Sequence, residues 1–234
     1  MMNDSILSCR NLSKNFGYYS ALSGVNMDIP RGRIVGLLGP NGSGKTTFMK
    51  LANGLLVPSE GEIIIGGHHP GPETKKIVSF LPATEYLPGY MTVENLLKFF
   101  CDFFEDFNRS KAEDMLRMLG IDPKLRLKTL SKGTKEKVQL ILAMSREAQL
   151  YLLDEPIGGV DPAARDYILR TIISNYSEEA SVIISTHLIA DVEQVLDDVI
   201  FIQDGQITMC RSVDDIREKE GKSVDEYFRE VFRC

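Results

Sequence analysis

Gly39-Pro-Asn-Gly-Ser-Gly-Lys-Thr46 is the stretch of the sequence that decides the fold. It follows an apolar run of strand length at 34–38, and the residues from Thr47 to Asn53 are typical of a helix start. A strand, a glycine-rich turn and a helix start together form a phosphate cradle, because backbone N–H groups converge on the anion and the helix dipole adds positive potential. A chance glycine-rich turn is the alternative, and both flanks argue against it. The stretch therefore predicts a nucleotide site.

The positions in this loop have distinct expected roles. Glycine reaches backbone dihedral angles that are closed to other residues, which lets the chain approach the phosphates closely. Lys45 is expected to reach the β- and γ-phosphates, and the Thr46 hydroxyl to bind Mg²⁺. The residues predicted to contact the nucleotide here are Gly39, Pro40, Asn41, Gly42, Ser43, Gly44, Lys45, Thr46 and Thr47.

Length and composition place the chain among globular proteins and exclude some functions. A chain of 234 residues, 43% hydrophobic and 26% charged, can bury the core of one large domain. Its net charge of −6 argues against nucleic-acid binding as the main function, because that needs a basic face. The sequence shows neither a signal peptide nor an apolar run long enough to span a bilayer, and its 4 cysteines are scattered. We therefore expect a soluble cytoplasmic domain with reduced thiols.

The order of the predicted elements indicates an α/β fold. Continuous apolar strands alternate with helices through much of the chain, which is typical of a parallel sheet covered on both faces. An aromatic-rich turn at 15–19 is predicted between the first two strands. Besides the strand that enters the phosphate loop and the helix that leaves it, the predicted strands are 5–12, 24–29, 62–65, 77–81, 150–153, 181–185, 199–203 and 206–210, and the predicted helices are 93–104, 110–119, 135–146, 162–174, 190–196, 212–220 and 224–232.

One part of the chain breaks this alternation. Residues 84–145 are predicted to be mostly helical, which makes them an insertion between two parts of a core at about 1–83 and 146–210, followed by short helices at 211–234. At 93–104 apolar residues recur at spacings of three and four. Such a stripe is either core or a surface on which a partner docks, and both interpretations remain open.

Two acidic residues supply chemistry that a phosphate loop lacks. Asp154 ends the apolar strand, where a carboxylate next to the phosphate loop can hold Mg²⁺. Glu155 points elsewhere and can polarise a water for in-line attack on the γ-phosphate. Because Pro156 follows at once, a strand-ending turn carboxylate is the alternative for Asp154. Two acids together at this place favour the catalytic interpretation.

Two further segments are candidates to complete the site. His187 follows a predicted strand, at the sheet edge where ligands bind, and could sense the γ-phosphate; taken alone it would be a packed or solvated loop histidine. Leu130-Ser-Lys-Gly-Thr134 precedes a helix, and Ser131 and Gly133 could bind an anion at its start. An ordinary helix cap is the alternative there.

Taken in order, these segments closely resemble the nucleotide-binding subunit of ATP-binding cassette (ABC) transporters of the bacterial ABC-2 and multidrug-exporter type, over about residues 5–210. The motifs that carry the resemblance are Gly39–Thr46 as the Walker A loop, Leu150–Glu155 as the Walker B strand with the catalytic glutamate, Leu130–Thr134 as the signature, Gly159–Pro162 as the D-loop, His187 as the switch histidine, and Phe16 as the aromatic residue that stacks on adenine. Without the resemblance, Phe16 is more simply a packing residue.

The resemblance implies the ABC ATPase fold, which is a P-loop NTPase with a mainly parallel sheet core, an N-terminal antiparallel β part and an inserted helical subdomain. It implies ATP and Mg²⁺ as ligands. The implied catalytic residues are Glu155 and His187, and the implied metal ligands are Thr46 and Asp154. It also implies a head-to-tail homodimer or paralogous heterodimer, in which Ser131 and Gly133 of one copy contact the ATP of the other. Membrane-spanning permease subunits would couple the ATP cycle to transport at the cytoplasmic face of the cell membrane.

The chain departs from the family pattern at two places. Lys132 stands where the signature usually has glycine. Thr134 and Lys135 stand where it has residues of the Gly/Met-Gln kind. Signatures of this LSKG type are similar to those of small bacterial exporters. Ala83 stands where the family has a glutamine that touches Mg²⁺ and the attacking water. Alanine offers no ligand, so we expect weaker Mg²⁺ coordination without loss of turnover. Thr84, Glu85 or water could take the place of the missing group.

Three classes of function fit such a site. The resemblance favours the ATPase subunit of a transporter, more specifically an exporter that works with a separate permease. A soluble ATPase of the same family, serving cofactor assembly or translation, is the second; a single Walker A motif in 234 residues argues against its ribosomal and chromosomal forms. A non-hydrolysing nucleotide sensor is the third, and Glu155 argues against it.

Overall fold

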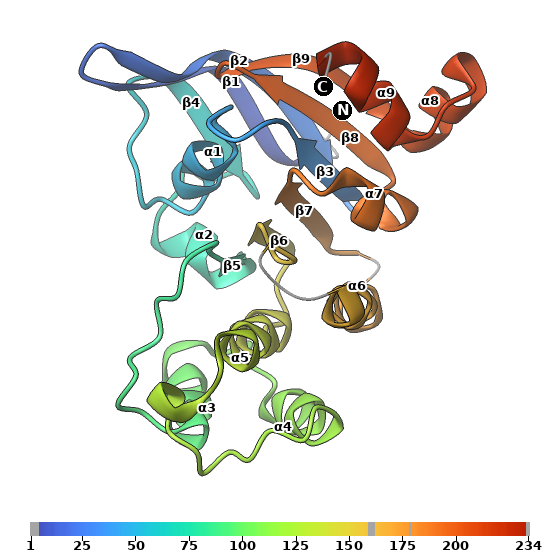
Figure 1. Ribbon diagram of the computed structural model, residues 1–234. Helices are drawn as coiled ribbons and strands as arrows, with labels where there is room; N and C mark the ends of the chain where they lie inside the picture. Colours follow the sequence, from blue (N-terminus) through green and yellow to red (C-terminus); the bar gives the residue numbers. More distant parts are fainter. Residues whose placement is uncertain (1–4, 159–161, 178, 233–234) are drawn as a thin grey trace.

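The computed structural model describes residues 5–158, 162–177 and 179–232, and Figure 1 shows a β-rich part and a helical part. The central sheet has six strands in the order β5-β6-β7-β3-β8-β9. These strands are β3 (Ile34–Leu38), β5 (Val78–Leu81), β6 (Leu150–Asp154), β7 (Ser181–Thr186), β8 (Asp198–Gln203) and β9 (Gln206–Ser212). Neighbouring strands are parallel from β5 to β8, and β9 pairs antiparallel with β8. The predicted mainly parallel sheet is confirmed.

Burial explains why the apolar runs form the central strands. Every residue of β3, β6 and β7 is buried, as expected for a parallel sheet covered on both faces. In β3, Ile34 and Leu38 face one hydrophobic cluster, and the alternate residues Val35 and Leu37 face another. The helices α5 (Lys132–Met144) and α6 (Pro162–Asn175) contribute to the first cluster. The helix α1 (Lys45–Ala52) and the N-terminal strands contribute to the second.

The N-terminal sheet has three antiparallel strands in the order β2-β1-β4. They are β1 (Ser5–Phe16), β2 (Tyr19–Pro30) and β4 (Glu60–Ile65). The predicted antiparallel part is confirmed, but the predicted turn at 15–19 is wrong, because both strands continue until Phe16 pairs with Tyr19. Gly17 at the remaining two-residue turn has a φ of 60°, which glycine adopts without strain and which so tight a turn requires.

Two helical segments differ from the predicted pattern. The helix α2 (Pro72–Ile77) is absent from the predicted elements, because its short polar sequence carries no apolar period. It begins with proline, and the Gly71 N–H donates to the Thr74 hydroxyl at 2.9 Å. The predicted helix at 190–196 is divided into α7 (Ile189–Val192) and the 3₁₀ turn η2 (Glu193–Val195).

The last two helices cover the sheet near its antiparallel edge. They are α8 (Val213–Glu220) and α9 (Val224–Phe232), close to the predicted ranges. The rings of Phe228 and Phe232 lie 5.2 and 5.7 Å from the ring of Phe201 in β8, measured between centroids. The end of the chain therefore caps the core.

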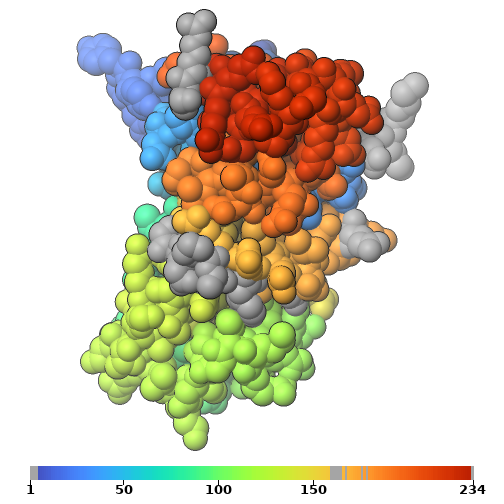
Figure 2. All heavy atoms as spheres, turned by 45° about the vertical axis from the view of Figure 1, so that its right-hand side comes forward, coloured from blue at the N-terminus to red at the C-terminus, as the bar shows by residue number. Residues whose placement is uncertain are grey.

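The helical part lies at the end of the molecule opposite β1 and β2, and the space-filling view shows it as one lobe (Figures 1 and 2). It contains α3 (Val93–Phe103), α4 (Arg109–Met118), the 3₁₀ turn η1 (Leu127–Thr129) and α5. Thr92, Asn108 and Ser131 cap α3, α4 and α5, each accepting a hydrogen bond from a backbone N–H three residues later. The helix α5 begins at Lys132 and not at the predicted 135, because Ser131 caps it there.

The apolar stripe of α3 is divided between core and surface. Val93, Leu96 and Leu97 are buried. Phe103 is 68% exposed, and its ring centroid lies 4.3 Å from that of Phe99. Part of the stripe is therefore core, and an exposed aromatic pair remains. Among the helices of the described residues, none is both long enough and apolar enough to cross a membrane.

Arg146, just after α5, connects the helical part with the sheet. Its side chain is 4% exposed, and its Nε donates to Asp106 at 2.6 Å. Its other N–H groups donate to Val78 of β5 at 3.2 Å and to two α2 carbonyls at 3.1 Å. The guanidinium lies 4.0 Å from the ring centroid of Phe104. A buried cation is thus matched by a carboxylate, backbone carbonyls and an aromatic face.

Arg146→Met should lower the free energy of unfolding by about 3 kcal/mol, because it leaves the Asp106 carboxylate and the carbonyls without their donor. Urea unfolding followed by circular dichroism measures the change. Arg109→Met is the matched control, since Arg109 forms an exposed ion pair with Glu113 at 2.7 Å, and such pairs contribute at most about 1 kcal/mol. Equal losses in both variants would contradict the role given to the buried pair.

Candidate active site

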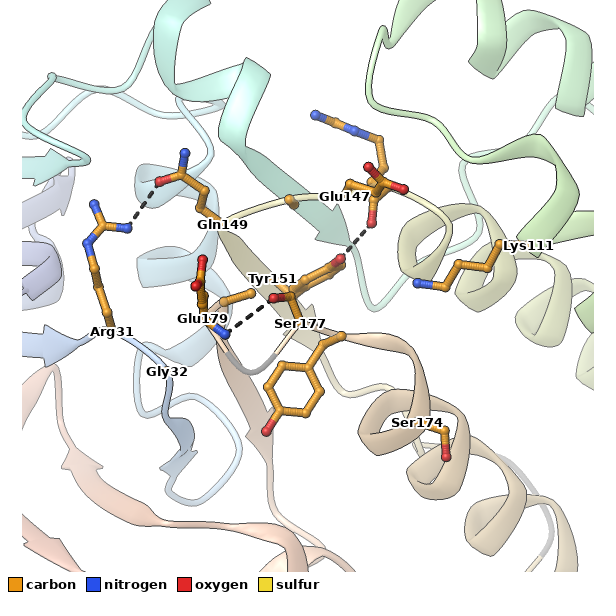
Figure 3. Close-up of a pocket in the computed structure, with 13 residues that line it drawn as sticks. Arg31, Gly32, Lys111, Glu147, Gln149, Tyr151, Ser174, Ser177 and Glu179 are labelled. Atoms are coloured by element: carbon orange, nitrogen blue, oxygen red, sulfur yellow. Dashed lines mark hydrogen bonds between the residues drawn. The ribbon is translucent and has the colours of Figure 1, made fainter.

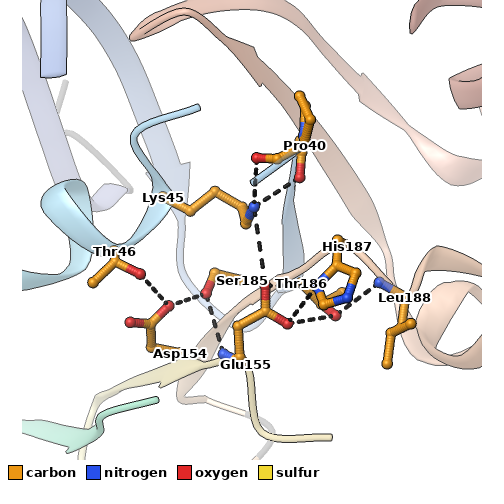
Figure 4. A network of polar contacts seen from close by, with 10 residues as sticks. Pro40, Lys45, Thr46, Asp154, Glu155, Ser185, Thr186, His187 and Leu188 are labelled. Carbon is orange, nitrogen blue, oxygen red and sulfur yellow. Dashed lines mark hydrogen bonds and ion pairs between the residues drawn. The ribbon is translucent and has the colours of Figure 1, made fainter. Parts of the chain in front are cut away.

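The phosphate loop and the two acids meet at one edge of the central sheet. The strand β3 runs into the loop, and β6 ends at Asp154. The strand β7 lies between them and pairs with both, so that Asp154 lies opposite Ser185, and Leu38 opposite Thr186. Because the three strands are parallel, their carboxyl ends share one edge, where open α/β sheets bind ligands. Figure 4 shows the side chains that converge there.

The phosphate loop has a shape that suits an anion. Gly44, the N-cap of α1, has a φ of 111°, and a Cβ on it would lie 2.6 Å from a backbone oxygen. The start of α1 therefore points its N–H groups into the loop. The Ser43 hydroxyl is buried and has no hydrogen-bond partner among the described residues, which suits an incoming phosphate oxygen.

Lys45 is buried, and its ammonium group turns back onto the loop. The Nζ donates to the carbonyl oxygens of Gly39 at 2.7 Å and Pro40 at 3.0 Å. A Glu155 oxygen lies 3.9 Å from it. Burial lowers the pKa of Lys45, while the charges of Glu155 and Asp154 oppose that shift. Phosphate oxygens are stronger acceptors than carbonyls, so the ammonium can exchange these bonds for a bound nucleotide.

Asp154 has the surroundings of a metal ligand. Its Oδ1 accepts hydrogen bonds from the Thr46 hydroxyl at 3.2 Å and from the Ser185 hydroxyl. Burial raises the pKa of Asp154, and the bonds from Ser185 and Thr46 lower it. A hydroxyl and a carboxylate side by side are the oxygen ligands that Mg²⁺ takes together with phosphates and water, so the residues present fit that ion. Ser185 is absent from the predicted site residues, and its place two residues before His187 was the available signal.

Backbone geometry and hydrogen bonds fix the orientation of the Glu155 side chain. Its φ of 50° is uncommon for a residue with a side chain, and its N–H donates to the Ser185 carbonyl at 2.9 Å. Its two carboxylate oxygens lie 3.0 and 3.1 Å from His187 Nδ1, and the Thr186 hydroxyl donates to one of them at 3.2 Å. Figure 4 shows Glu155 between Lys45 and His187.

A cavity of about 230 Å³ opens at the phosphate loop, lined by residues 41–47, Glu155 and the start of β2. The Tyr19 hydroxyl donates to the Gly42 carbonyl at 3.3 Å, so an aromatic ring stands at this cavity. Phe16 does not line it; its side chain is half exposed, and the Lys14 ammonium lies 5.2 Å from its ring centroid. Sequence reasoning missed Tyr19, although it follows Phe16 by only a few residues.

Ser131 and Gly133 lie away from this cavity. The Ser131 hydroxyl accepts the Thr134 N–H at 3.2 Å and lies 2.8 Å from the Thr134 hydroxyl, as an ordinary helix cap does. Neither Ser131 nor Gly133 lines the cavity at the phosphate loop. The predicted D-loop ends at Pro162, where α6 begins, and its residues 159–161 lie outside the described residues.

A much larger cavity, of about 1060 Å³, lies at the amino ends of the parallel strands (Figure 3). Its polar groups bond to one another: Arg31 donates to Gln149 at 3.1 Å, and the Glu179 N–H donates to the Ser177 hydroxyl at 3.3 Å. None of the predicted site residues lines it. The candidate site is therefore identified by the functional side chains that meet there, and not by the size of its cavity.

Comparison with known proteins agrees with this geometry. The family model described as ABC transporter matches residues 22–158. The chain is 33% identical over 216 residues to the uncharacterised ABC transporter ATP-binding protein YdbJ of Bacillus subtilis, covering 88% of this chain and 69% of that protein. It is 30% identical over 215 residues to the lantibiotic transport ATP-binding protein SrtF of Streptococcus pyogenes, covering 89% and 92%. A solved ATP-binding subunit of an ABC transporter superposes with a TM-score of 0.88 at 30% identity, covering 97% of this chain and all of the other.

The family match contains both the phosphate loop and the pair of acids at the end of β6. The structural likeness extends over nearly the whole chain and confirms the predicted ABC ATPase fold. The chain therefore belongs to the ABC transporter family, as an ATP-binding subunit that carries the family's ATPase activity.

Proposed function

We propose that the chain is the ATP-hydrolysing subunit of an exporter, acting at the cytoplasmic face of the membrane. Two copies, or this chain and a paralogue, close head to tail over ATP and drive a separate permease. The observation that carries the hydrolytic part is Glu155, whose carboxylate lies between the Lys45 ammonium and the His187 ring. A carboxylate placed there can accept a proton from water next to the phosphates.

In the proposed reaction a water attacks the γ-phosphorus of ATP in line with the bond to the bridging oxygen, which breaks. Glu155 accepts the proton of the water, and ADP keeps the bridging oxygen. Lys45 and the N–H groups at the start of α1 balance the charge of the phosphates. Mg²⁺ on Thr46 and Asp154 would add positive charge at the β- and γ-phosphates. His187 holds the carboxylate of Glu155 in place by its hydrogen bond.

The proposed dimer supplies the part of the site that one chain lacks. A Cβ on Gly133 would meet nothing within 4 Å, so the first turn of α5 can be approached closely by a partner. The start of a helix favours an anion. A γ-phosphate that contacts the loop of one copy and Ser131 of the other would favour the closed dimer, and hydrolysis would remove that contact.

The proposed contact with the permease is an apolar groove of about 480 Å³ between β5, α3 and α5. Leu55, Phe80, Tyr86 and Phe100 contribute its apolar wall, and Lys50 lies on its lining. Leu55 and Tyr86 are exposed although they are apolar or aromatic. A short amphipathic helix with an acidic residue is the kind of permease segment that fits such a groove. The predicted docking segments near 81–90 and at 93–104 both contribute to its lining.

The direction of transport and the domain boundaries are also proposals. The likeness to a lantibiotic transport ATP-binding protein supports export. The signature with Lys132 gives the same indication. We propose the division into a core at about 1–83 and 146–210, a helical subdomain at 84–145 and C-terminal helices at 211–234.

Glu155→Gln should lower kcat at least about 100-fold, because glutamine cannot accept the proton of the water. ATP binding should persist, so the variant should accumulate as an ATP-bound dimer, detected by size-exclusion chromatography with light scattering. Lys45→Ala is the control and should neither bind ATP nor dimerise under the same conditions. Turnover by Glu155→Gln at the rate of the parent would refute the hydrolytic role.

We propose that the adenine of ATP lies outside the phosphate cavity, against Tyr19 and Phe16. Tyr19→Ala and Phe16→Ala should then each weaken ATP binding about tenfold, because stacking on one base contributes about 1–3 kcal/mol. Binding of inorganic triphosphate should not change, since it has no base. Fluorescence titration with both ligands measures the difference. Tyr18→Ala is the control, because Tyr18 is fully exposed at the hairpin turn. Equal losses for ATP and triphosphate would show that these rings do not contact the base.

Tyr86→Glu should abolish copurification of the subunit with its proposed permease partner, because a charge in the apolar groove opposes docking of an apolar helix face. Affinity purification of the coexpressed pair measures it, and circular dichroism checks the fold. Met118→Glu places the same charge on an exposed side chain of α4 and should leave copurification intact. Normal copurification of Tyr86→Glu would place the permease contact elsewhere.

A further inference from the structure

A second cavity adjoins Glu155 at the carboxyl end of β6. It measures about 160 Å³ and lies between α5 and the ends of β5 and β6; we name it the α5 chamber. Within the described ranges, Glu155 is the one residue that lines both this chamber and the cavity at the phosphate loop. The proton-accepting carboxylate therefore borders both the place of the phosphates and this chamber.

The α5 chamber is suited to water. A water molecule in the liquid occupies about 30 Å³, so several fit, and polar walls are what hydrated cavities require. The wall from α5 is polar and consists of Lys132, Lys135, Glu136 and Gln139. Glu85 on the facing wall pairs with Lys135 at 2.8 Å, and the buried Oε2 of Glu136 has no hydrogen-bond partner among the described residues. Water is the ligand that such a mixture of donors and acceptors would take.

Gln139 differs from the other polar residues of this wall because it is neutral and only 3% exposed. Its Nε2 donates to the Thr84 carbonyl at 3.3 Å. That bond assigns the amide nitrogen to Thr84 and leaves the amide oxygen as an acceptor. Burying a carboxamide is unfavourable unless its groups find partners, and water in the chamber is a partner within its reach.

Among the described residues, the facing wall offers no second carboxamide. Pro82 and Ala83 line the chamber, and neither side chain has a hydrogen-bonding atom. A carboxamide near the chamber therefore comes from α5 and not from the segment after β5. Because both walls enclose one small space, a carboxamide on either wall could reach the same water.

We propose that Gln139 positions the water that Glu155 activates. The amide oxygen accepts one hydrogen bond from the water, and Glu155 accepts the other. The water oxygen then bonds to the γ-phosphorus, the bridging P–O bond breaks with its electron pair on ADP, and Glu155 takes the proton. Gln139 itself exchanges no proton. This inference rests on the proposed hydrolysis and specifies how its water is held.

Gln139→Met tests the inference, because methionine keeps the length and burial of the side chain without its amide. We expect kcat to fall about tenfold, which corresponds to about 1.4 kcal/mol of barrier, with KM for ATP and Kd for ADP unchanged. Adding Ala83→Gln places a carboxamide on the facing wall and should restore most of kcat. Lys137→Met is the matched control on α5, because Lys137 does not line the chamber.

A kcat of Gln139→Met close to that of the parent would overturn the inference. So would a loss of ATP affinity parallel to the loss of kcat, or a double variant that binds ATP normally but recovers no activity. If Gln139→Met does not fold, Gln139→Leu is used in its place with the same readouts. Failure of the proposed function has a different signature, namely a parent protein whose ATP turnover Glu155→Gln does not abolish.

Discussion

The active edge of the molecule depends on one buried carboxylate. Asp154 accepts hydrogen bonds from Thr46 and Ser185, which lie 108 and 31 positions away in the sequence, and so fixes α1, β7 and β6 against one another. This is possible only because β6, β7 and β3 are parallel neighbours whose carboxyl ends share one edge. Burial raises the pKa of Asp154, so ionising this carboxyl costs more here than in water, while the bonds from Ser185 and Thr46 oppose that shift. Mg²⁺ bound to the carboxylate would offset this cost of ionising a buried group.

Asp154 and Glu155 are consecutive acids that suit different roles. Asp154 ends a strand and faces α1, whereas the positive φ of Glu155 turns its carboxylate toward His187 and Thr186. The first acid is surrounded by hydroxyl donors and suits a metal. The second borders two cavities and suits proton transfer. Two carboxylates of the same chemistry thus differ because of what the neighbouring strands place around them.

Local signals were enough to predict much of this arrangement. The phosphate loop, the acids after β6 and the continuous apolar strands each carry their meaning within a few residues, and the sheet followed from their alternation. The helix α2 could not be predicted, since it has no apolar period, and the hairpin was too short in the prediction because pairing across Gly17 lengthens both strands. The places of Tyr19 and Gln139 could not be predicted either, because the cavity that each one lines depends on how the chain folds. The sequence indicated a missing group at Ala83, but only the packing of α5 shows what faces it.

The helix α5 joins three sites that the proposed cycle must coordinate. Ser131 caps it, Gln139 lines the chamber beside Glu155, and Ala143 lines the apolar groove proposed for the permease. At a rise of about 1.5 Å per residue, Ser131 and Gln139 lie about 12 Å apart on one rigid element. In the proposed dimer, Ser131 contacts the ATP of the other copy, so closure would move the same helix that sets the water for Glu155. Arg146 fixes the far end of that element to β5 and Asp106. In the proposed cycle, coupling between nucleotide, water and permease therefore needs no signal through a flexible loop, because one helix would contact all three.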